Sequence, residues 1–169
     1  MYKNNANVPN WDLISTCNIN NKKGLILIEG KAHELELEKK GKIFIPGKSS
    51  ISNHEKISKC INEARQFLIK QGYNVNISID SHYQVSNRIA WAWKLANLGV
   101  PVIMVFLGFI GDKYFPDYFQ DEKHWLSVFN SYIEGILPAS FFEKSIDCGN
   151  SEMRVIVRSK SIENLSSKQ

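Results

Sequence analysis

The chain has 169 residues, of which 43% are hydrophobic and 22% charged, a composition typical of a folded globular domain. Its net charge of +4 is compatible with a nucleic-acid partner but does not require one, because many enzymes with neutral ligands are equally basic. The three cysteines lack metal-ligand or redox spacing, the N-terminus is too polar for a signal peptide, and the longest apolar run, 100–110, is too short for a membrane span. We therefore expect one cytoplasmic domain over residues 1–169, with frayed ends at 1–8 and 160–169, and no membrane partner.

Two short apolar runs near the N-terminus predict a β-hairpin. Residues 11–17 have the pattern of a strand, residues 18–24 are rich in turn-forming types, and LILIEGKAH at 25–33 has the pattern of a second strand. The charged segment 34–50 is expected to be a loop with room for one helical turn.

Two capping-box patterns predict the starts of helices. Ser52-x-x-Glu55 precedes an apolar stripe that ends near Gly72, and Ser81-x-x-Gln84 precedes a stripe that runs to the next glycine. The residues expected to be buried are Ile57, Ile61, Ala64 and Leu68 in the first helix, and Val85, Ile89, Ala92, Trp93 and Ala96 in the second.

The second half of the chain adds strand, helix and strand. Residues 101–107 form a continuous apolar run, which is typical of a strand covered on both faces in a central sheet. Residues 122–136 have the apolar spacing of a third helix, and residues 153–158 alternate like a half-exposed strand. The order β-β-α-α-β-α-β predicts an α/β fold with a single mixed central β-sheet flanked by helices.

Charged residues gather on one face at the end of the LILIEGKAH strand. Because side chains alternate along a strand, Glu29, Lys31 and His33 share a face with Leu25 and Leu27. A strand that runs from the core into a cleft has this pattern. An ion pair at a sheet edge has it too, and such a pair contributes only about 0–1 kcal/mol. The strand alone leaves both interpretations open.

Asp12 favours the cleft. It lies in the partner strand of the predicted hairpin, where it can face Glu29. Two neighbouring carboxylates repel each other unless a cation or a proton lies between them, and Mg²⁺ binds one or two carboxylates together with waters and phosphate oxygens. A lysine one pleat away can orient water or stabilise charge on a phosphate. Asp12, Glu29 and Lys31 therefore have the chemistry to hydrolyse a phosphodiester.

Asp12, followed by Glu29-Gly30-Lys31 at the end of a hydrophobic strand, resembles the PD-(D/E)xK restriction-endonuclease-like superfamily. The longer stretches PNWDLISTC, GLILIEGKAHELEL and SHYQVSNRIAWAWKLANLGVPVIMVFLGF look like a group of functionally uncharacterised bacterial proteins placed in it. The resemblance implies a restriction-endonuclease-like fold and a nuclease that acts on nucleic acid, DNA above RNA, with Mg²⁺ or Mn²⁺ as cofactor. It implies that Asp12, Glu29 and the backbone carbonyl of Gly30 bind the metal, and that Lys31 assists the attacking water.

The same resemblance suggests supporting residues. Superfamily members often place a glutamine or a basic residue on the helix behind the catalytic strand, which implies a catalytic role for Gln84 and a supporting role for Arg88. Asn87 and His33 are further supporting candidates. Gln84 is equally compatible with a helix cap, Arg88 with a surface ion pair, and His33 with a polar strand end. The tryptophans of the helices are expected in the core rather than as platforms for bases.

The sequence departs from the superfamily pattern around Asp12. Trp11 stands where the family has proline, and only eleven residues precede Asp12, whereas the superfamily core begins with a helix and a strand. We therefore expect a trimmed N-terminal part, a fragment, or a homodimer in which a second subunit completes the sheet. The alternative functions are a catalytically inactive binding or interaction module on the same fold, and a hydrolase of a small phosphorylated or nucleotide substrate.

Overall fold

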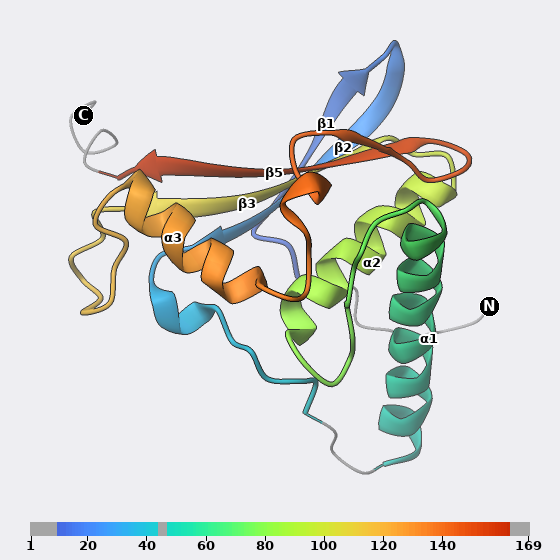
Figure 1. The fold of residues 1–169 in the computed structure, drawn as a ribbon, viewed down its shortest axis with the longest axis horizontal. Helices are drawn as coiled ribbons and strands as arrows, with labels where there is room; N and C mark the ends of the chain where they lie inside the picture. The colour runs from blue at the N-terminus through green and yellow to red at the C-terminus, as the bar shows by residue number, and fades with distance from the viewer. Residues whose placement is uncertain (1–9, 44–46, 163–169) are drawn as a thin grey trace.

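A computed structural model describes residues 10–43 and 47–162, which form an α/β fold around one five-stranded mixed sheet. The strand order is β1-β2-β3-β5-β4, in which β2, β3 and β5 run parallel while β1 and β4 are antiparallel edge strands (Figure 1). The predicted single mixed sheet with helices is confirmed. The elements are β1 (Leu13–Ile19), β2 (Lys22–Lys31), the 3-10 helix η1 (Glu34–Glu36), α1 (Lys48–Lys70), α2 (Tyr83–Asn97), β3 (Val102–Ile110), α3 (Glu122–Ile133), the 3-10 helix η2 (Ala139–Phe141), β4 (Ser145–Asp147) and β5 (Glu152–Ser161).

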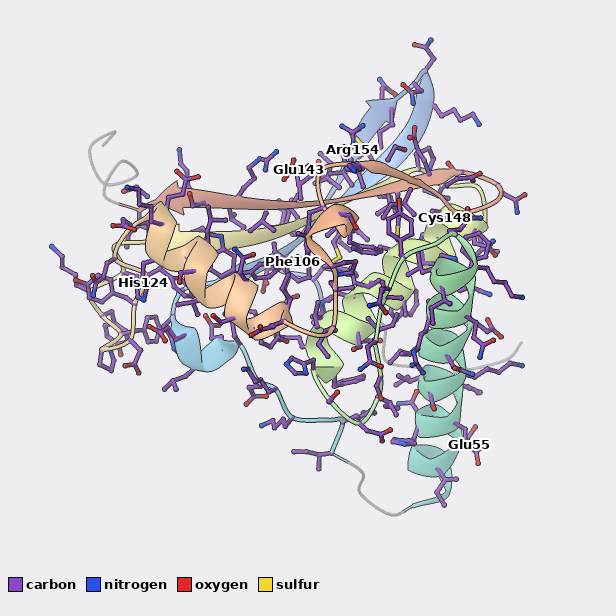
Figure 2. All side chains as sticks on the ribbon, viewed as in Figure 1. Glu55, Phe106, His124, Glu143, Cys148 and Arg154 are labelled. Atoms are coloured by element: carbon purple, nitrogen blue, oxygen red, sulfur yellow. The ribbon has the colours of Figure 1, made fainter. Side chains whose placement is uncertain are left out.

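The helices lie on one side of the sheet (Figure 1). On that side the ring of Phe106 in β3 lies 5.0 Å from the ring of Phe129 in α3, and α1 packs against α2 rather than against the sheet. Figure 2 shows Phe106 on the helix side and Arg154 on the opposite side. No helix within the described residues covers that opposite face, so Ile103 and Leu107 of β3 are only half-buried. Val105, between them on the same face, is buried, so the prediction that this strand is covered on both faces is confirmed for the helix side and only partly for the other.

The N-terminal hairpin is confirmed, but its turn is tighter than predicted. Asn20 and Asn21 both have positive φ, 50° and 62°, so they form a two-residue turn. Asparagine tolerates this left-handed conformation better than most residues because its short polar side chain bonds locally. As a result, β1 and β2 extend through most of the segment 18–24 that the sequence assigns to the turn.

Both capping-box predictions are wrong in their details. Helix α1 begins at Lys48 with Gly47 as its N-cap, which places Ser52 and Glu55 inside the helix. Helix α2 has His82 as its N-cap, with φ of 46° and no side-chain cap hydrogen bond. The backbone N–H groups of His82 and Tyr83 instead donate to the carbonyls of Lys39 and Lys40. This pairing with the preceding loop fixes the helix start and satisfies the free N–H donor of Tyr83 without a capping side chain.

The predicted apolar stripes are confirmed as the core. Buried stripe residues are Ile61, Ala64, Leu68, Val85, Ile89, Ala92, Trp93 and Ala96, with Ile57 partly buried against them. Helix α3 ends at Ile133, three residues before the predicted end, and its cap is Asp121, which accepts from the N–H of His124. The three-residue strand β4 is too short to leave a periodic signal, and the sequence does not predict it.

The predicted fraying of the chain ends can be compared with the structure only at residues 160–162. Strand β5 continues through Ser161, two residues into the tail expected to fray, while 1–8 and the rest of that tail beyond 162 lie outside the described residues. No helix in the described ranges is long and apolar enough to cross a membrane.

Candidate functional site

Glu29 and Lys31 lie at the carboxyl end of β2, on the face that the helices cover. The Nζ atom of Lys31 donates to Oε1 of Glu29 over 2.8 Å, and the two residues are only 5% and 3% exposed respectively. Strand β2 is internal, because it pairs with β1 on one side and with β3 on the other. The shared face predicted from strand alternation is confirmed. The alternative interpretation, an ion pair at a sheet edge, is correct in the pairing of Glu29 with Lys31 but wrong in its location, because β2 is not an edge strand.

Arg88 of α2 joins this pair. Its Nε atom donates to Oε2 of Glu29 over 2.6 Å, and its Nη2 atom donates to the backbone carbonyl of Asn10 over 2.7 Å. The guanidinium group lies over the ring of Trp11, 4.8 Å from its centroid. Arg88 is itself buried, so the alternative of a surface ion pair is also wrong. Glu29, Lys31 and Arg88 are named the Glu29 cluster below.

The Glu29 cluster holds two cations and one carboxylate in a buried position. Taking charges out of water costs several kcal/mol per ion, and close pairing offsets this cost only in part. Replacing buried ion pairs by well-packed apolar residues is often neutral or stabilising in proteins. The surplus positive charge is suited to binding an anion, since charge-assisted hydrogen bonds to carboxylates or phosphates are strong in such sites.

Asp12 reaches the same end of β2 through the hairpin. Its N–H donates to the carbonyl of Ile28 over 3.2 Å, next to the Leu13–Ile28 pair at which the hairpin register begins. Its Oδ2 atom accepts from the N–H of Gly30 over 2.8 Å. A Cβ atom at Gly30 would lie 3.7 Å from this oxygen and 2.9 Å from Phe109 Cε2. The backbone of Gly30 thus holds the carboxylate of Asp12 at the end of β2. That this carboxylate faces Glu29 stays a prediction.

The carboxylates of Asp12 and Glu29 at the end of β2 have the donor chemistry for a hard divalent cation, although Glu29 is already bonded to two cationic side chains. Mg²⁺ takes one or two carboxylates and completes its shell with waters and phosphate oxygens. Asp12 is exposed and offers carboxylate oxygen, but both oxygens of Glu29 are engaged by Lys31 and Arg88. No group of three or more His, Cys, Asp or Glu residues within 10–43 and 47–162 has the arrangement of a metal site. Each of these oxygens keeps a second lone pair, so a metal ion bound here would share Glu29 with Lys31 and Arg88.

Tyr132 of α3 lies within electrostatic range of Glu29. Burial raises the pKa of Tyr132 to about 12, and the negative charge of Glu29 adds to this shift. The phenol is therefore neutral at every physiological pH. The sequence predicts Tyr132 only as a buried residue of the third helix, because nothing in its local pattern indicates proximity to β2.

Gln84, Asn87 and Arg88 share one wall of a pocket of about 630 Å³ between α1, α2 and the segment 38–43. The three residues therefore lie on one side of α2. Gln84 does not cap the helix, since α2 has no side-chain cap hydrogen bond. In the described part of the chain, no hydrogen bond joins Gln84 to the Glu29 cluster. Gln84 and Asn87 thus share the pocket wall with Arg88, and of these three residues Arg88 is the one that bonds to Glu29.

His33 is not brought to the Glu29 cluster. Strand β2 ends at Lys31, so the alternation that sets His33 on the face of Glu29 stops before it. The imidazole ring stacks on Phe115 with centroids 4.3 Å apart, and the backbone forms a bridge with Tyr118. The contacts of His33 thus lie with the loop after β3. The predicted shared face is wrong for this residue.

Several residues of the site carry no signal in the sequence. From the sequence, Trp11 is notable only because it replaces the proline of the superfamily pattern. In the structure its ring packs on the guanidinium of Arg88. Lys42 and Lys56 line the pocket from a loop and from α1, more than 30 residues before Arg88. Trp93 and Trp125 are buried in the core as expected, whereas Trp91 is half-buried and lines the pocket.

No protein-family model, curated protein or solved structure matches this chain.

Proposed function

We propose that this protein is a metal-dependent phosphodiester hydrolase that acts on nucleic acid, with Asp12, Glu29 and Lys31 as its reacting groups. One observation carries the proposal. A carboxylate and an ammonium 2.8 Å apart are buried at the end of an internal strand, and the carboxylate of Asp12 accepts from the N–H of Gly30, the residue between them. Buried charges with specific charged partners beside a pocket are candidates for a functional site, because a purely structural role would be served as well by apolar residues.

Asp12 and Glu29 would hold the metal ion, with the backbone carbonyl of Gly30 as a further oxygen donor. When bound, Mg²⁺ or Mn²⁺ would neutralise charge on the phosphate and lower the pKa of a coordinated water. The hydrogen bond from the N–H of Gly30 fixes one carboxylate oxygen of Asp12 and leaves the group exposed to substrate. The chain therefore presents an oriented carboxylate before any ligand arrives.

Lys31 and Arg88 would divide two tasks. The Nζ atom of Lys31 donates to Glu29, and its remaining proton donors would stabilise charge on a phosphate or orient an attacking water. Arg88 is fixed by Glu29, by the carbonyl of Asn10 and by the ring of Trp11. It is a positioning residue for Glu29, and its charge lowers the cost of bringing a phosphate close.

The test is cleavage of plasmid and of labelled oligonucleotides, DNA and RNA, with Mg²⁺ or Mn²⁺. Lys31→Met keeps the length of the side chain and removes its charge, and Glu29→Gln keeps the hydrogen-bonding shape. We expect each to lower the cleavage rate by about a hundredfold or more. The matched control is Glu143→Gln, which removes the carboxylate of a half-exposed pair with Arg158 and should cleave like the original protein.

Two results would overturn the proposal. One is the absence of cleavage by the original protein with either metal. The other is equal cleavage by Lys31→Met, Glu29→Gln and the original protein, which would identify a contaminating nuclease. Thermal unfolding of each variant shows whether a loss of rate comes from a loss of fold.

A binding module without hydrolysis is the second candidate. The observation in its favour is that both oxygens of Glu29 already accept hydrogen bonds from cations. In that case Mn²⁺ titrated into the protein at millimolar concentration would give no heat of binding, and Asp12→Ala would behave like the original protein. Nucleic acid would still bind, because the cations of the Glu29 cluster do not depend on the metal.

A further inference from the structure

The pocket next to the Glu29 cluster has two helical walls of similar spacing. Helices α1 and α2 each contribute residues at i, i+3, i+4 and i+7, which lie on one helical face. The segment 38–43 closes a third side, and the pocket volume of about 630 Å³ lies within the range of small-ligand sites. The residues of these two helical faces are Asn53, Lys56, Ile57 and Cys60 in α1, and Gln84, Asn87, Arg88 and Trp91 in α2.

The pocket is positively charged. Four of its lining residues are basic, whereas Glu38 is the acidic one, and Lys40 is engaged with Glu38 over 2.7 Å. The Nζ atom of Lys42 lies 5.3 Å from the ring centroid of Tyr83. Lys56 is exposed and forms no ion pair with another residue in the described ranges. Lys42 and Lys56 are therefore available to an anion at two sides of the pocket.

The remaining lining offers flat apolar faces and amides. Tyr83 and Trp91 present aromatic rings, and burial raises the pKa of Tyr83, which keeps its phenol neutral. Gln84 and Asn87 present side-chain amides, which donate and accept hydrogen bonds from the same group. A nucleotide requires these three components together: a surface for the base plane, donors and acceptors for the base edge, and cations for the phosphate.

Arg88 connects the pocket to the Glu29 cluster. It lines the pocket and donates to Glu29 over 2.6 Å. We propose that the pocket binds one nucleotide of a single-stranded nucleic acid, with its base against Trp91 and Tyr83 and its phosphate at Lys42 and Lys56. The neighbouring phosphodiester then lies at the Glu29 cluster. This inference rests on the proposed function, which names nucleic acid as the substrate. It adds that the nucleic acid is single-stranded and that one of its nucleotides binds in this pocket. A base held in a duplex is stacked and paired, and must leave the stack to enter such a pocket.

The test measures binding without metal, so that cleavage plays no part. A fluorescently labelled 12-nucleotide single strand is titrated with the full chain in EDTA and followed by anisotropy. Lys56→Gln is compared with Lys59→Gln, which makes the same change on the exposed surface of the same helix outside this pocket. We expect Lys56→Gln to weaken binding by about three- to tenfold and to reduce the salt slope by about 0.7, the value for one phosphate contact. Lys59→Gln should bind like the original protein.

Trp91 provides a second, independent variant pair. Trp91→Leu removes the aromatic face and should weaken binding of the single strand by about tenfold, whereas Trp91→Phe should retain most of it. Thermal unfolding of both variants separates lost stacking from lost fold. Equal binding by Lys56→Gln and Lys59→Gln, or by Trp91→Leu and Trp91→Phe, would overturn the inference.

Competitors identify what the pocket recognises. Unlabelled single strand should displace the label at lower concentration than the matching duplex, and a mononucleotide should displace it better than inorganic phosphate. If phosphate competes as well as the mononucleotide, or the duplex as well as the single strand, the inference fails. Cleavage assays separate it from the proposed function. If the single strand binds through the pocket but is not cleaved, the proposed hydrolysis is wrong and the inference about the pocket stands. If cleavage occurs and is unchanged by substitution of Lys56 or Trp91, the inference about the pocket is wrong and the proposed function stands.

Discussion

The carboxylate of Glu29 in β2 and the guanidinium of Arg88 in α2 are joined by a 2.6 Å hydrogen bond across 59 residues of sequence. Lys31 occupies the other oxygen of the same carboxylate. The contact ties the helix that lines the pocket to the strand that carries the candidate reacting groups. A change at either residue therefore affects both the fold and the site, and experiments must separate the two.

Replacement of Arg88 by methionine should destabilise the protein strongly. The variant leaves Glu29 buried with Lys31 as its remaining cation, and breaking a buried pair on one side costs about 3 kcal/mol of unfolding free energy. Urea unfolding followed by circular dichroism measures this cost. The control is Arg158→Met, whose pair with Glu143 is half-exposed and should cost less than about 1 kcal/mol. Equal costs for the two variants would contradict the structural importance of the Glu29 cluster.

Asp12→Asn should reduce metal affinity while it preserves the fold. Asparagine retains a carbonyl oxygen that can accept from the N–H of Gly30, so the melting temperature should change little. The lost charge should weaken Mn²⁺ binding by about tenfold or more in calorimetric titration, since hard cations prefer carboxylate oxygen. Mn²⁺ should bind the original protein more tightly with oligonucleotide present, because the phosphates offset the charges of Lys31 and Arg88. Identical titrations of variant and original protein would count against Asp12 as a ligand.

Alanine at Gly108 should be far more damaging than alanine at Gly30. A Cβ atom at Gly108 would lie 2.6 Å from Cγ of Trp125, a fully buried side chain that has no room to shift. Overpacking of this kind costs about 1–3 kcal/mol. At Gly30 the nearest atom is Cε2 of the half-buried Phe109, which can move. Chemical unfolding of both variants tests the order, and a larger loss at Gly30 would reverse it.

Alkylation of Cys60 should be slow at neutral pH and should accelerate as the pH rises beyond 9. Burial is the main cause that raises the pKa of this thiol, with Glu63 adding to the shift and Lys94 opposing it. A raised pKa means less reactive thiolate at any given pH, so the rate increases until the pH exceeds that pKa. Cys148, fully buried with its pKa raised to about 12, should stay unmodified in the folded protein.

Mass spectrometry after iodoacetamide treatment at several pH values measures these rates, and treatment in urea provides the control in which all thiols react. Because Cys60 lines the pocket, a bound single strand should also slow its alkylation. Alkylation of Cys148 ahead of Cys60 would show that the burial of these two thiols is misassigned.

Helix starts show where local pattern and tertiary contact disagree. Ser52 and Ser81 have the sequence form of caps, but the chain enters α1 earlier, at Gly47, and enters α2 through pairing of His82 and Tyr83 with the preceding loop. A capping box describes one way to satisfy free N–H groups, and a neighbouring segment that supplies carbonyls makes it unnecessary. His33 is a similar case, since strand alternation has no meaning beyond the last paired residue.

The sequence by itself determined the hairpin, the buried stripes of α1 and α2, the mixed sheet, and the common face of Glu29 and Lys31. These features follow from periodicity, because strand and helix each repeat their side-chain directions at a fixed interval. Only the tertiary structure decided that β2 is internal, that Arg88 rather than His33 completes the cluster, and that Lys42, Lys56 and Trp91 share one pocket. These facts depend on strand order and on how α1 and α2 pack together. Contacts between distant elements are set by the burial of whole faces, which no short stretch of sequence encodes.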